Sequence, residues 1–292
     1  MPVPPFHPDL QQVRFLPQLS LGTRSLRVMR FLGRLARPDG SVPVVPVSPD
    51  VSVRLFRPAG PGPFPALLWV HGGGLVSGTA AMDDAFCRRV SEELGAVVAS
   101  VEYRLAPEHP FPTPLEDCWT ALTWLAGRAD VDPARVAVGG ASAGGNLAAG
   151  TVLLARERGL DLVFQLLVYP MLDDRTTAHA DPSAVRVWTP GSNRFGWSSY
   201  LGDTTEVSPL AAPARAEDLT GQPPAWIGVG THDLFHAEDV EHARRLRAAG
   251  VEVELLEVPG AYHGFDAVQG ATAVSREFRD AQVAALRRAL VG

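Results

Sequence analysis

Residues 136–150 read VAVGGASAGGNLAAG, so one serine stands among small residues between a short apolar run and an alanine-rich stretch. This order is typical of a buried strand that turns tightly into a helix. The segment 140–144 fits the pattern G-x-S-x-G, which places its serine on such a turn. We therefore expect the hydroxyl of Ser142 to stand exposed at the carboxyl end of a sheet. The pattern alone also fits a tight turn with no chemistry, so the rest of the chain must decide.

Apolar runs alternate with helical patterns from residue 66 onward, which predicts a mainly parallel, doubly wound α/β sheet. Two edge strands are expected within residues 41–57, with a turn near Asp50. Further strands are expected at 66–70, 96–101, 136–138, 163–169, 225–230 and 251–258. Helices are expected at 83–94, 115–128, 239–249 and 271–290.

Composition excludes several classes of function. The formal charge is −6 and no basic patch appears, so nucleic acid is not an expected partner. All 26 basic residues are arginine, which excludes a Schiff-base lysine and a P-loop lysine. Residues 1–15 lack the pattern of a secretory signal, and no apolar run is long enough to span a membrane. We therefore expect a cytoplasmic protein, with Cys87 and Cys118 as buried free thiols; a disulfide between them stays open.

Three consecutive glycines follow the apolar run at 66–70, in the sequence H-G-G-G at 71–74. Without side chains, backbone N–H groups can converge on one point, where they can stabilise a negatively charged oxygen. A flexible glycine loop is the plainer alternative. A phosphate-binding loop is disfavoured because its lysine is absent.

A serine nucleophile needs a base to take its proton and an acid to orient that base. On a sheet of this kind the three residues follow the order serine, acid, histidine. His263 follows the last expected strand, and Asp233 follows the strand at 225–230. Glu238 and Asp239 are competing acids, but both are expected inside the next helix. The plainer roles are a loop histidine that caps a backbone group for His263 and a helix N-cap for Asp233.

Two regions do not fit the strand–helix alternation. Residues 1–40 read as one or two amphipathic helices ahead of the first strand, either a plain extension or an N-terminal cap segment. Residues 170–224 are rich in proline, glycine and aromatic side chains and are too long for a simple crossover. We expect this insertion to contribute to the cap and the substrate pocket of a catalytic domain over residues 41–292.

The chain resembles the hormone-sensitive-lipase-like family of α/β-hydrolases, in its bacterial esterase branch. The matching segments are H-G-G-G at 71–74, Y-R-L-A-P-E at 103–108, G-A-S-A-G-G-N at 140–146, D-L-F at 233–235 and H-G-F at 263–265. The resemblance implies the α/β-hydrolase fold, with an eight-stranded sheet and a helical cap.

The resemblance also implies that Ser142 is the nucleophile, His263 the general base and Asp233 its partner. The implied oxyanion hole consists of the backbone N–H groups of Gly73, Gly74 and Ala143. The implied activity is hydrolysis of small-molecule esters with short-to-medium acyl chains, through an acyl-serine intermediate and without a cofactor or metal.

Three positions depart from the family pattern. Ala141 replaces the usual aspartate or threonine, Leu234 replaces the usual proline, and Leu75 stands where an aromatic residue is common. These changes are expected to loosen the serine turn, relax the loop after Asp233 and widen the pocket. The motifs leave amide, thioester or peptide hydrolysis open, as well as a non-catalytic ligand receptor. A homodimer formed through an edge strand is also compatible with the sequence.

Overall fold

The computed structural model describes residues 5–18, 20–35 and 38–292. Its centre is an eight-stranded sheet in the order β1-β2-β4-β3-β5-β6-β7-β8, and the strands from β3 to β8 are all parallel. The strands are β1 Val44–Pro46, β2 Ser52–Phe56, β3 Phe64–Val70, β4 Val97–Glu102, β5 Val131–Ala141, β6 Phe164–Val168, β7 Ala225–Gly230 and β8 Val253–Val258. The expected mainly parallel, eight-stranded architecture is confirmed.

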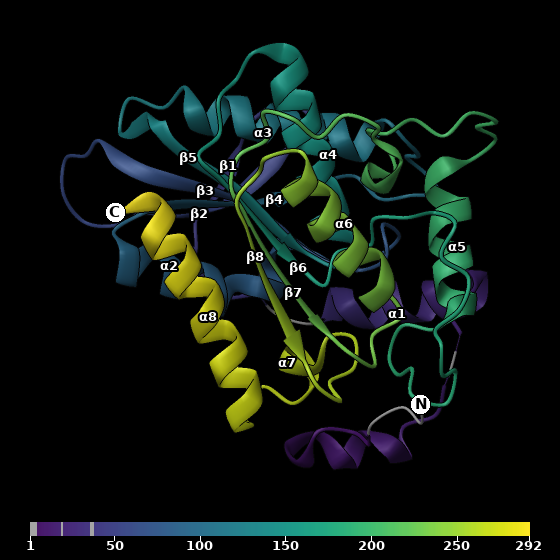
Figure 1. The fold of residues 1–292 in the computed structure, drawn as a ribbon. Coiled ribbons are helices and arrows are strands. Elements are labelled where there is room, and N and C mark those ends of the chain that lie inside the picture. The colour runs from purple at the N-terminus through teal and green to yellow at the C-terminus, as the bar shows by residue number, and fades with distance from the viewer. Residues whose placement is uncertain (1–4, 19, 36–37) are drawn as a thin grey trace.

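Helices cover both faces of the sheet, as expected for a doubly wound fold (Figure 1). Helices α2 (Asp84–Leu94) and α8 (Ala273–Leu290) pack on one face, and α3 (Thr113–Ala126), α4 (Ala143–Arg158) and α6 (His236–Ala248) pack on the other. In β3, Leu67 and Trp69 point into the first layer, whereas Leu68 and Val70 point into the second. Because both faces are buried, the central strands read as continuous apolar runs in the sequence.

Strand β5 is longer than the sequence predicts. It begins at Val131, which pairs with Phe64, and regular pairing with β3 resumes only at Val136. Residues 132–135 therefore form an irregularity within the strand.

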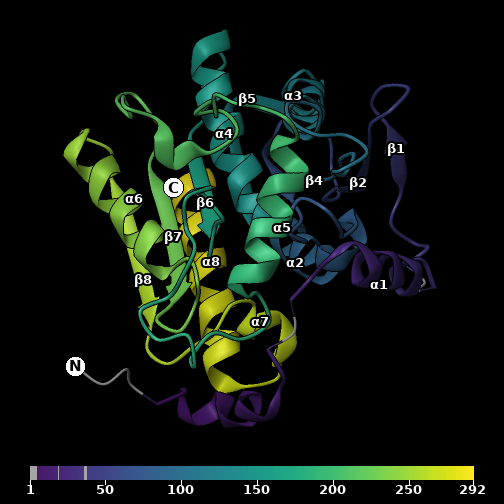
Figure 2. The same cartoon turned by 90° about the vertical axis from the view of Figure 1, so that its right-hand side faces the viewer.

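The N-terminal region reaches two parts of the molecule in the described residues. The 3-10 helix η1 (Pro8–Phe15) lies below α7 (Phe265–Val268), and its Asp9 accepts a hydrogen bond from the backbone N–H of Val274 in the first turn of α8 (Figure 2). Helix α1 (Thr23–Leu35) reaches the loops after β3 and β4, since Arg30 donates to the carbonyls of Val76 and Ala106. Residues 1–4, 19 and 36–37 of the expected cap segment lie outside the described residues.

The insertion at 170–224 contains a helix that the sequence analysis does not predict, α5 (Pro190–Leu201). Its start has a local cause: the side chain of Thr189 accepts a hydrogen bond from the N–H of Ser192, and Pro190 opens the first turn. A short 3-10 helix, η3 (Pro213–Arg215), follows later in the insertion.

Both cysteines are free and buried, so the alternative of a disulfide is wrong. Cys87 packs in the layer of α2 and α8, whereas Cys118 packs in the layer on the other side of the sheet. Among the helices of the described residues, none combines the length and the apolar character that a bilayer crossing requires.

Candidate active site

Ser142 occupies a tight turn between β5 and α4, with φ 57° and ψ −119°. Such a conformation costs a non-glycine residue about 1–3 kcal/mol. Glycine is required two positions to either side of Ser142, because a side chain there would collide with the backbone. A Cβ on Gly140 would lie 2.3 Å from the carbonyl oxygen of Gly144, and a Cβ on Gly144 would lie 2.0 Å from that of Val70. The expected strand–turn–helix geometry is therefore present.

The structure brings Ser142, His263 and Asp233 together. The Nε2 atom of His263 lies 2.9 Å from the Oγ of Ser142, and its Nδ1 atom lies 2.8 Å from Oδ2 of Asp233. The three residues follow β5, β8 and β7, and all three are buried. The expectation that Ser142 stands exposed is therefore wrong, although its place at the carboxyl end of the sheet is as expected. Because a carboxylate only accepts, Nδ1–H donates to Asp233 and Nε2 is left to accept the serine proton.

Asp233 also stabilises its own loop. Its Oδ1 atom accepts a hydrogen bond of 3.0 Å from the N–H of Phe235, while Oδ2 faces the imidazole. Phe235, not Asp233, stands at the N-cap position of α6. The carboxylate therefore holds both the loop and the ring of His263.

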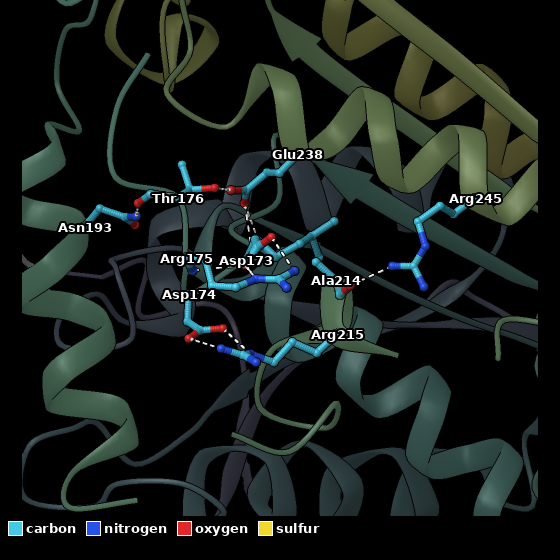
Figure 3. Close-up of polar contacts among 10 residues, drawn as sticks. Asp173, Asp174, Arg175, Thr176, Asn193, Ala214, Arg215, Glu238 and Arg245 are labelled. Atoms are coloured by element: carbon cyan, nitrogen blue, oxygen red, sulfur yellow. Dashed lines mark hydrogen bonds and ion pairs between the residues drawn. The ribbon is translucent and has the colours of Figure 1, made fainter. Parts of the chain in front are cut away.

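Glu238 and Asp239 lie inside α6, as expected, and both are buried. The helix begins at His236, three positions before the expected start, which places Glu238 in its first turn. Glu238 faces the insertion and accepts hydrogen bonds from the N–H groups of Leu172 and Asp173 and from the hydroxyl of Thr176 (Figure 3). Burial raises the pKa of both carboxyls well above the ordinary range.

Further polar contacts anchor the insertion around Glu238 (Figure 3). Asn193 of α5 donates to the carbonyl of Thr176 over 2.8 Å, and Arg215 forms an ion pair of 2.6 Å with Asp174. Arg245 of α6 donates to the carbonyl of Ala214 over 2.6 Å. The first residues of the insertion are thus tied to α5, to η3 and to the helix that follows Asp233.

The glycine loop after β3 runs directly beside the serine turn. A Cβ on Gly72 would lie 3.5 Å from the Cβ of Ser142. Gly73 and Gly74 have φ of 126° and 64°, and a Cβ on Gly74 would lie 2.0 Å from the ring of Trp188. Only residues without side chains fit this close approach.

Three backbone N–H groups at this point remain available to donate a hydrogen bond to a ligand. Ala143 is the first residue of α4, where an N–H has no partner within the helix. No acceptor in the described residues takes a hydrogen bond from the N–H of Gly73, Gly74 or Ala143. The start of α4 also carries a partial positive charge, which favours an anion beside Ser142.

His71 supports the start of the glycine loop. Its ring stacks on Tyr103 with centroids 4.3 Å apart, and the Tyr103 hydroxyl donates to the carbonyl of His71. Burial lowers the pKa of His71 to about 4, so the ring is neutral near pH 7. The oxygen of Gly73 is fixed by the hydroxyl of Ser77.

Two aromatic residues with no role assigned from the sequence pack against the imidazole of His263. Tyr169 lies edge-on at 4.9 Å between ring centroids, and Phe235 lies edge-on at 5.1 Å. The only sequence signal for Tyr169 is its place directly after β6, at the edge where the other site residues collect.

Comparisons with known proteins identify relatives of the chain. Residues 67–267 match a family described as having the alpha/beta hydrolase fold. Esterase LipI of Mycobacterium tuberculosis is 35% identical over 276 residues, which cover 86% of each protein. Carboxylesterase NlhH of Mycobacterium tuberculosis is 38% identical over 260 residues, which cover 82% of this chain and 79% of NlhH.

A solved structure of a bacterial heroin esterase superposes with a TM-score of 0.87 at 39% identity, covering 99% of both chains. The match over residues 67–267 includes the glycine loop, the serine turn and the loops of Asp233 and His263. The chain belongs to the α/β-hydrolase fold family, in its hormone-sensitive-lipase-like branch.

Proposed function

We propose that the chain is a serine carboxylesterase that hydrolyses small-molecule esters with short-to-medium acyl chains. Ser142 is the nucleophile, His263 the general base and Asp233 the group that orients His263. The observation that carries the proposal is the pair of contacts on one imidazole, 2.9 Å to the hydroxyl of Ser142 and 2.8 Å to the carboxylate of Asp233. The esterase names of the relatives support ester substrates.

In the first step, Oγ of Ser142 attacks the ester carbonyl carbon while Nε2 of His263 takes the hydroxyl proton. The carbonyl π electrons move onto oxygen, and the resulting tetrahedral anion collapses as the carbon–alkoxy bond breaks. The proton on Nε2 passes to the leaving alcohol. Water then attacks the acyl-serine by the same route, and the acid leaves as Ser142 regains its proton.

The oxyanion hole in this proposal is formed by the N–H groups of Gly73, Gly74 and Ala143. Two observations support this assignment. These N–H groups donate to no other acceptor in the described residues, and Gly72 lies close to the Cβ of Ser142. Removal of one such donor typically costs about 10²–10³ in kcat.

The cap in this proposal consists of residues 1–40 and the insertion at 170–224. It is supported by hydrogen bonds that join these two segments, from the N–H of Leu21 to Ser192 and between the hydroxyls of Ser20 and Thr189. It is also supported by a hydrogen bond from the side chain of Arg30 to the carbonyl of Val76, in the loop that follows the glycines. Segments distant in sequence would then enclose the acyl chain and exclude water.

The test compares wild type with Ser142→Ala on p-nitrophenyl esters from acetyl to palmitoyl, with Ser198→Ala of α5 as an exposed serine control. We expect wild type and Ser198→Ala to turn over the shorter esters, and Ser142→Ala to lose activity on the order of 10⁶-fold. A fluorophosphonate should label wild type on Ser142 alone.

Other outcomes would overturn the proposal in distinct ways. Turnover retained by Ser142→Ala would reassign the nucleophile. Labelling of Ser142 with faster cleavage of matched amides or thioesters would change the substrate class. No labelling and no turnover in wild type would favour a ligand receptor.

A further inference from the structure

The four residues from Val168 to Met171 hold the backbone of Ser142 on both sides. The carbonyl of Val168 accepts a hydrogen bond of 2.8 Å from the N–H of Ser142, and the N–H of Met171 donates over 3.1 Å to the carbonyl of Ser142. Tyr169 lies between these two contacts, and its own N–H donates to Gly228 of β7. This segment is therefore fixed to the serine turn and to the neighbouring strand.

Tyr169 adopts a backbone conformation that large residues avoid, with φ 36°. Strain of this kind persists only where the surroundings over-determine it, and it is concentrated at functional sites. Here the consequence is visible: the phenol ring packs edge-on against the imidazole of His263, with centroids 4.9 Å apart. One short segment thus contacts the backbone of Ser142 and the side chain of His263.

The far end of the phenol is also fixed. The hydroxyl of Tyr169 donates over 2.8 Å to Oδ1 of Asp266, and both residues are buried. Asp266 belongs to the first turn of α7, three positions after His263. The guanidinium of Arg279 in turn holds the carbonyls of Asp266 and Gly270, at 2.6 Å each. The ring of Tyr169 is therefore anchored at its backbone and at its hydroxyl.

We propose that Tyr169 is a positioning residue for His263 and that Asp266 keeps the Tyr169 ring in place. This inference rests on the proposed function, because it concerns the base of the same reaction. The imidazole must stay within reach of the Ser142 hydroxyl and then deliver the proton to the leaving group. A misplacement of about 1 Å can cost on the order of 10²-fold in rate.

The test uses Tyr169→Phe, which keeps the ring and removes the tether, and Asp266→Ala, which removes the acceptor. We expect each to lower kcat about tenfold while KM changes less than about twofold, in the range typical of groups that orient a reactive side chain. Both variants break the same contact, the hydrogen bond between Tyr169 and Asp266. The double variant should therefore also lose about tenfold in kcat rather than about a hundredfold. Asp266→Asn keeps an acceptor oxygen and should restore most of kcat.

Tyr262→Phe is the matched control. Tyr262 adjoins His263, is buried, and its hydroxyl lies 3.2 Å from Gln269, just after α7. Among the ring contacts of the described residues, none joins Tyr262 to His263. We therefore expect its kcat to stay within about twofold of wild type, whatever its effect on thermal stability.

A purely structural role would give a different result. If Tyr169→Phe and Asp266→Ala keep wild-type kcat at a temperature where they are fully folded, the proposal is overturned. It is equally overturned if their losses multiply in the double variant, or if Tyr262→Phe loses as much kcat as Tyr169→Phe.

A readout without turnover separates this inference from the proposed function. The Nδ1–H proton of His263, hydrogen-bonded to Asp233, can be followed by proton NMR in the resting enzyme. We expect this resonance to broaden by solvent exchange in Tyr169→Phe and Asp266→Ala but to stay sharp in Tyr262→Phe. A resonance that is equally sharp in all of them would contradict the positioning role, even if wild type hydrolyses esters well.

Discussion

The Nε2 atom of His263 lies 2.9 Å from the Oγ of Ser142, although 121 positions separate the two residues in sequence. The topology of the sheet explains this contact. Strands β5, β6, β7 and β8 are adjacent and parallel, and they are followed in turn by Ser142, Tyr169, Asp233 and His263. Parallel strands present their carboxyl ends at one edge, so the order of the strands places all four side chains together.

The contact between His263 and Asp233 predicts a large effect of Asp233→Asn. An asparagine amide can donate to Nδ1, which would leave the Nε2 atom protonated and unable to accept from Ser142. We expect kcat to fall about 10⁴-fold while thermal stability changes little. Steady-state kinetics on a short p-nitrophenyl ester, with a thermal melt of the same sample, measures both.

Asp239→Asn is the control for this change. Asp239 is also buried, in the first turn of the helix that follows Asp233, and burial raises its pKa well above the ordinary range. A protonated carboxyl resembles a carboxamide, so this variant should keep kcat close to wild type. Comparable losses in the two variants would remove the special role given to Asp233.

The sequence allows Ser142, Asp233 and His263 to be predicted because each depends on a local pattern and on the order of strands. Glu238 and Tyr169 could not be assigned a role in this way. The sequence presents Glu238 only as a competing acid inside a helix, and its partners lie more than 60 positions away at Leu172 and Thr176. Such contacts depend on how the insertion folds back, which no periodicity encodes.

Gly74→Ala should disrupt the glycine loop by direct collision. The added Cβ would lie 2.0 Å from Cη2 of Trp188, and the residue has φ 64°. We expect at least about a hundredfold loss of kcat as the loop shifts away from Ser142. Gly95→Ala is the matched control, because Gly95 has φ 62° but nothing within 4 Å of an added Cβ.

The control should lose only about 1–2 kcal/mol of stability and no kcat, since it carries the same backbone strain without the collision. In Gly74→Ala/Trp188→Ala the ring is gone, so part of the lost kcat should return. If the double variant is no better than Gly74→Ala, the backbone conformation and not Trp188 explains the requirement for glycine.

Glu238→Ala should destabilise the insertion. It leaves the N–H groups of Leu172 and Asp173 and the hydroxyl of Thr176 without their acceptor, at a cost of about 2–4 kcal/mol. Glu238→Gln keeps one acceptor oxygen and adds a donor that the Thr176 oxygen can accept, so it should be nearly neutral. Thermal melts and limited proteolysis within residues 170–190 measure the difference. Equal stability of the two variants would show that these contacts do not hold the insertion.

Asp83 gives a pH-dependent prediction. Its carboxyl accepts a hydrogen bond of 2.8 Å from the indole of Trp69, while burial raises its pKa from 3.8 to about 6, with further contributions from Asp266 and Asp84. The folded state therefore binds this proton more tightly than the unfolded state. The favourable contribution is complete below pH 3.8 and is lost as the pH rises through about 6. Above that pH the ionised carboxyl costs on the order of 2–3 kcal/mol.

Asp83→Asn removes this titration and keeps an oxygen for the indole of Trp69. Its melting temperature should match wild type most closely at and below pH 4 and exceed it increasingly between pH 4 and 6, by several degrees at about 2–3 kcal/mol. Asp132→Asn should show no such rise across this range, because a hydrogen bond from Arg135 lowers the pKa of Asp132, so its favourable contribution is already present above pH 3.8 and is lost only as the pH falls further. A difference between Asp83→Asn and wild type that stays constant across this range would mean that Asp83 is already ionised in the folded protein at pH 4, and the raised pKa assigned to it would be wrong.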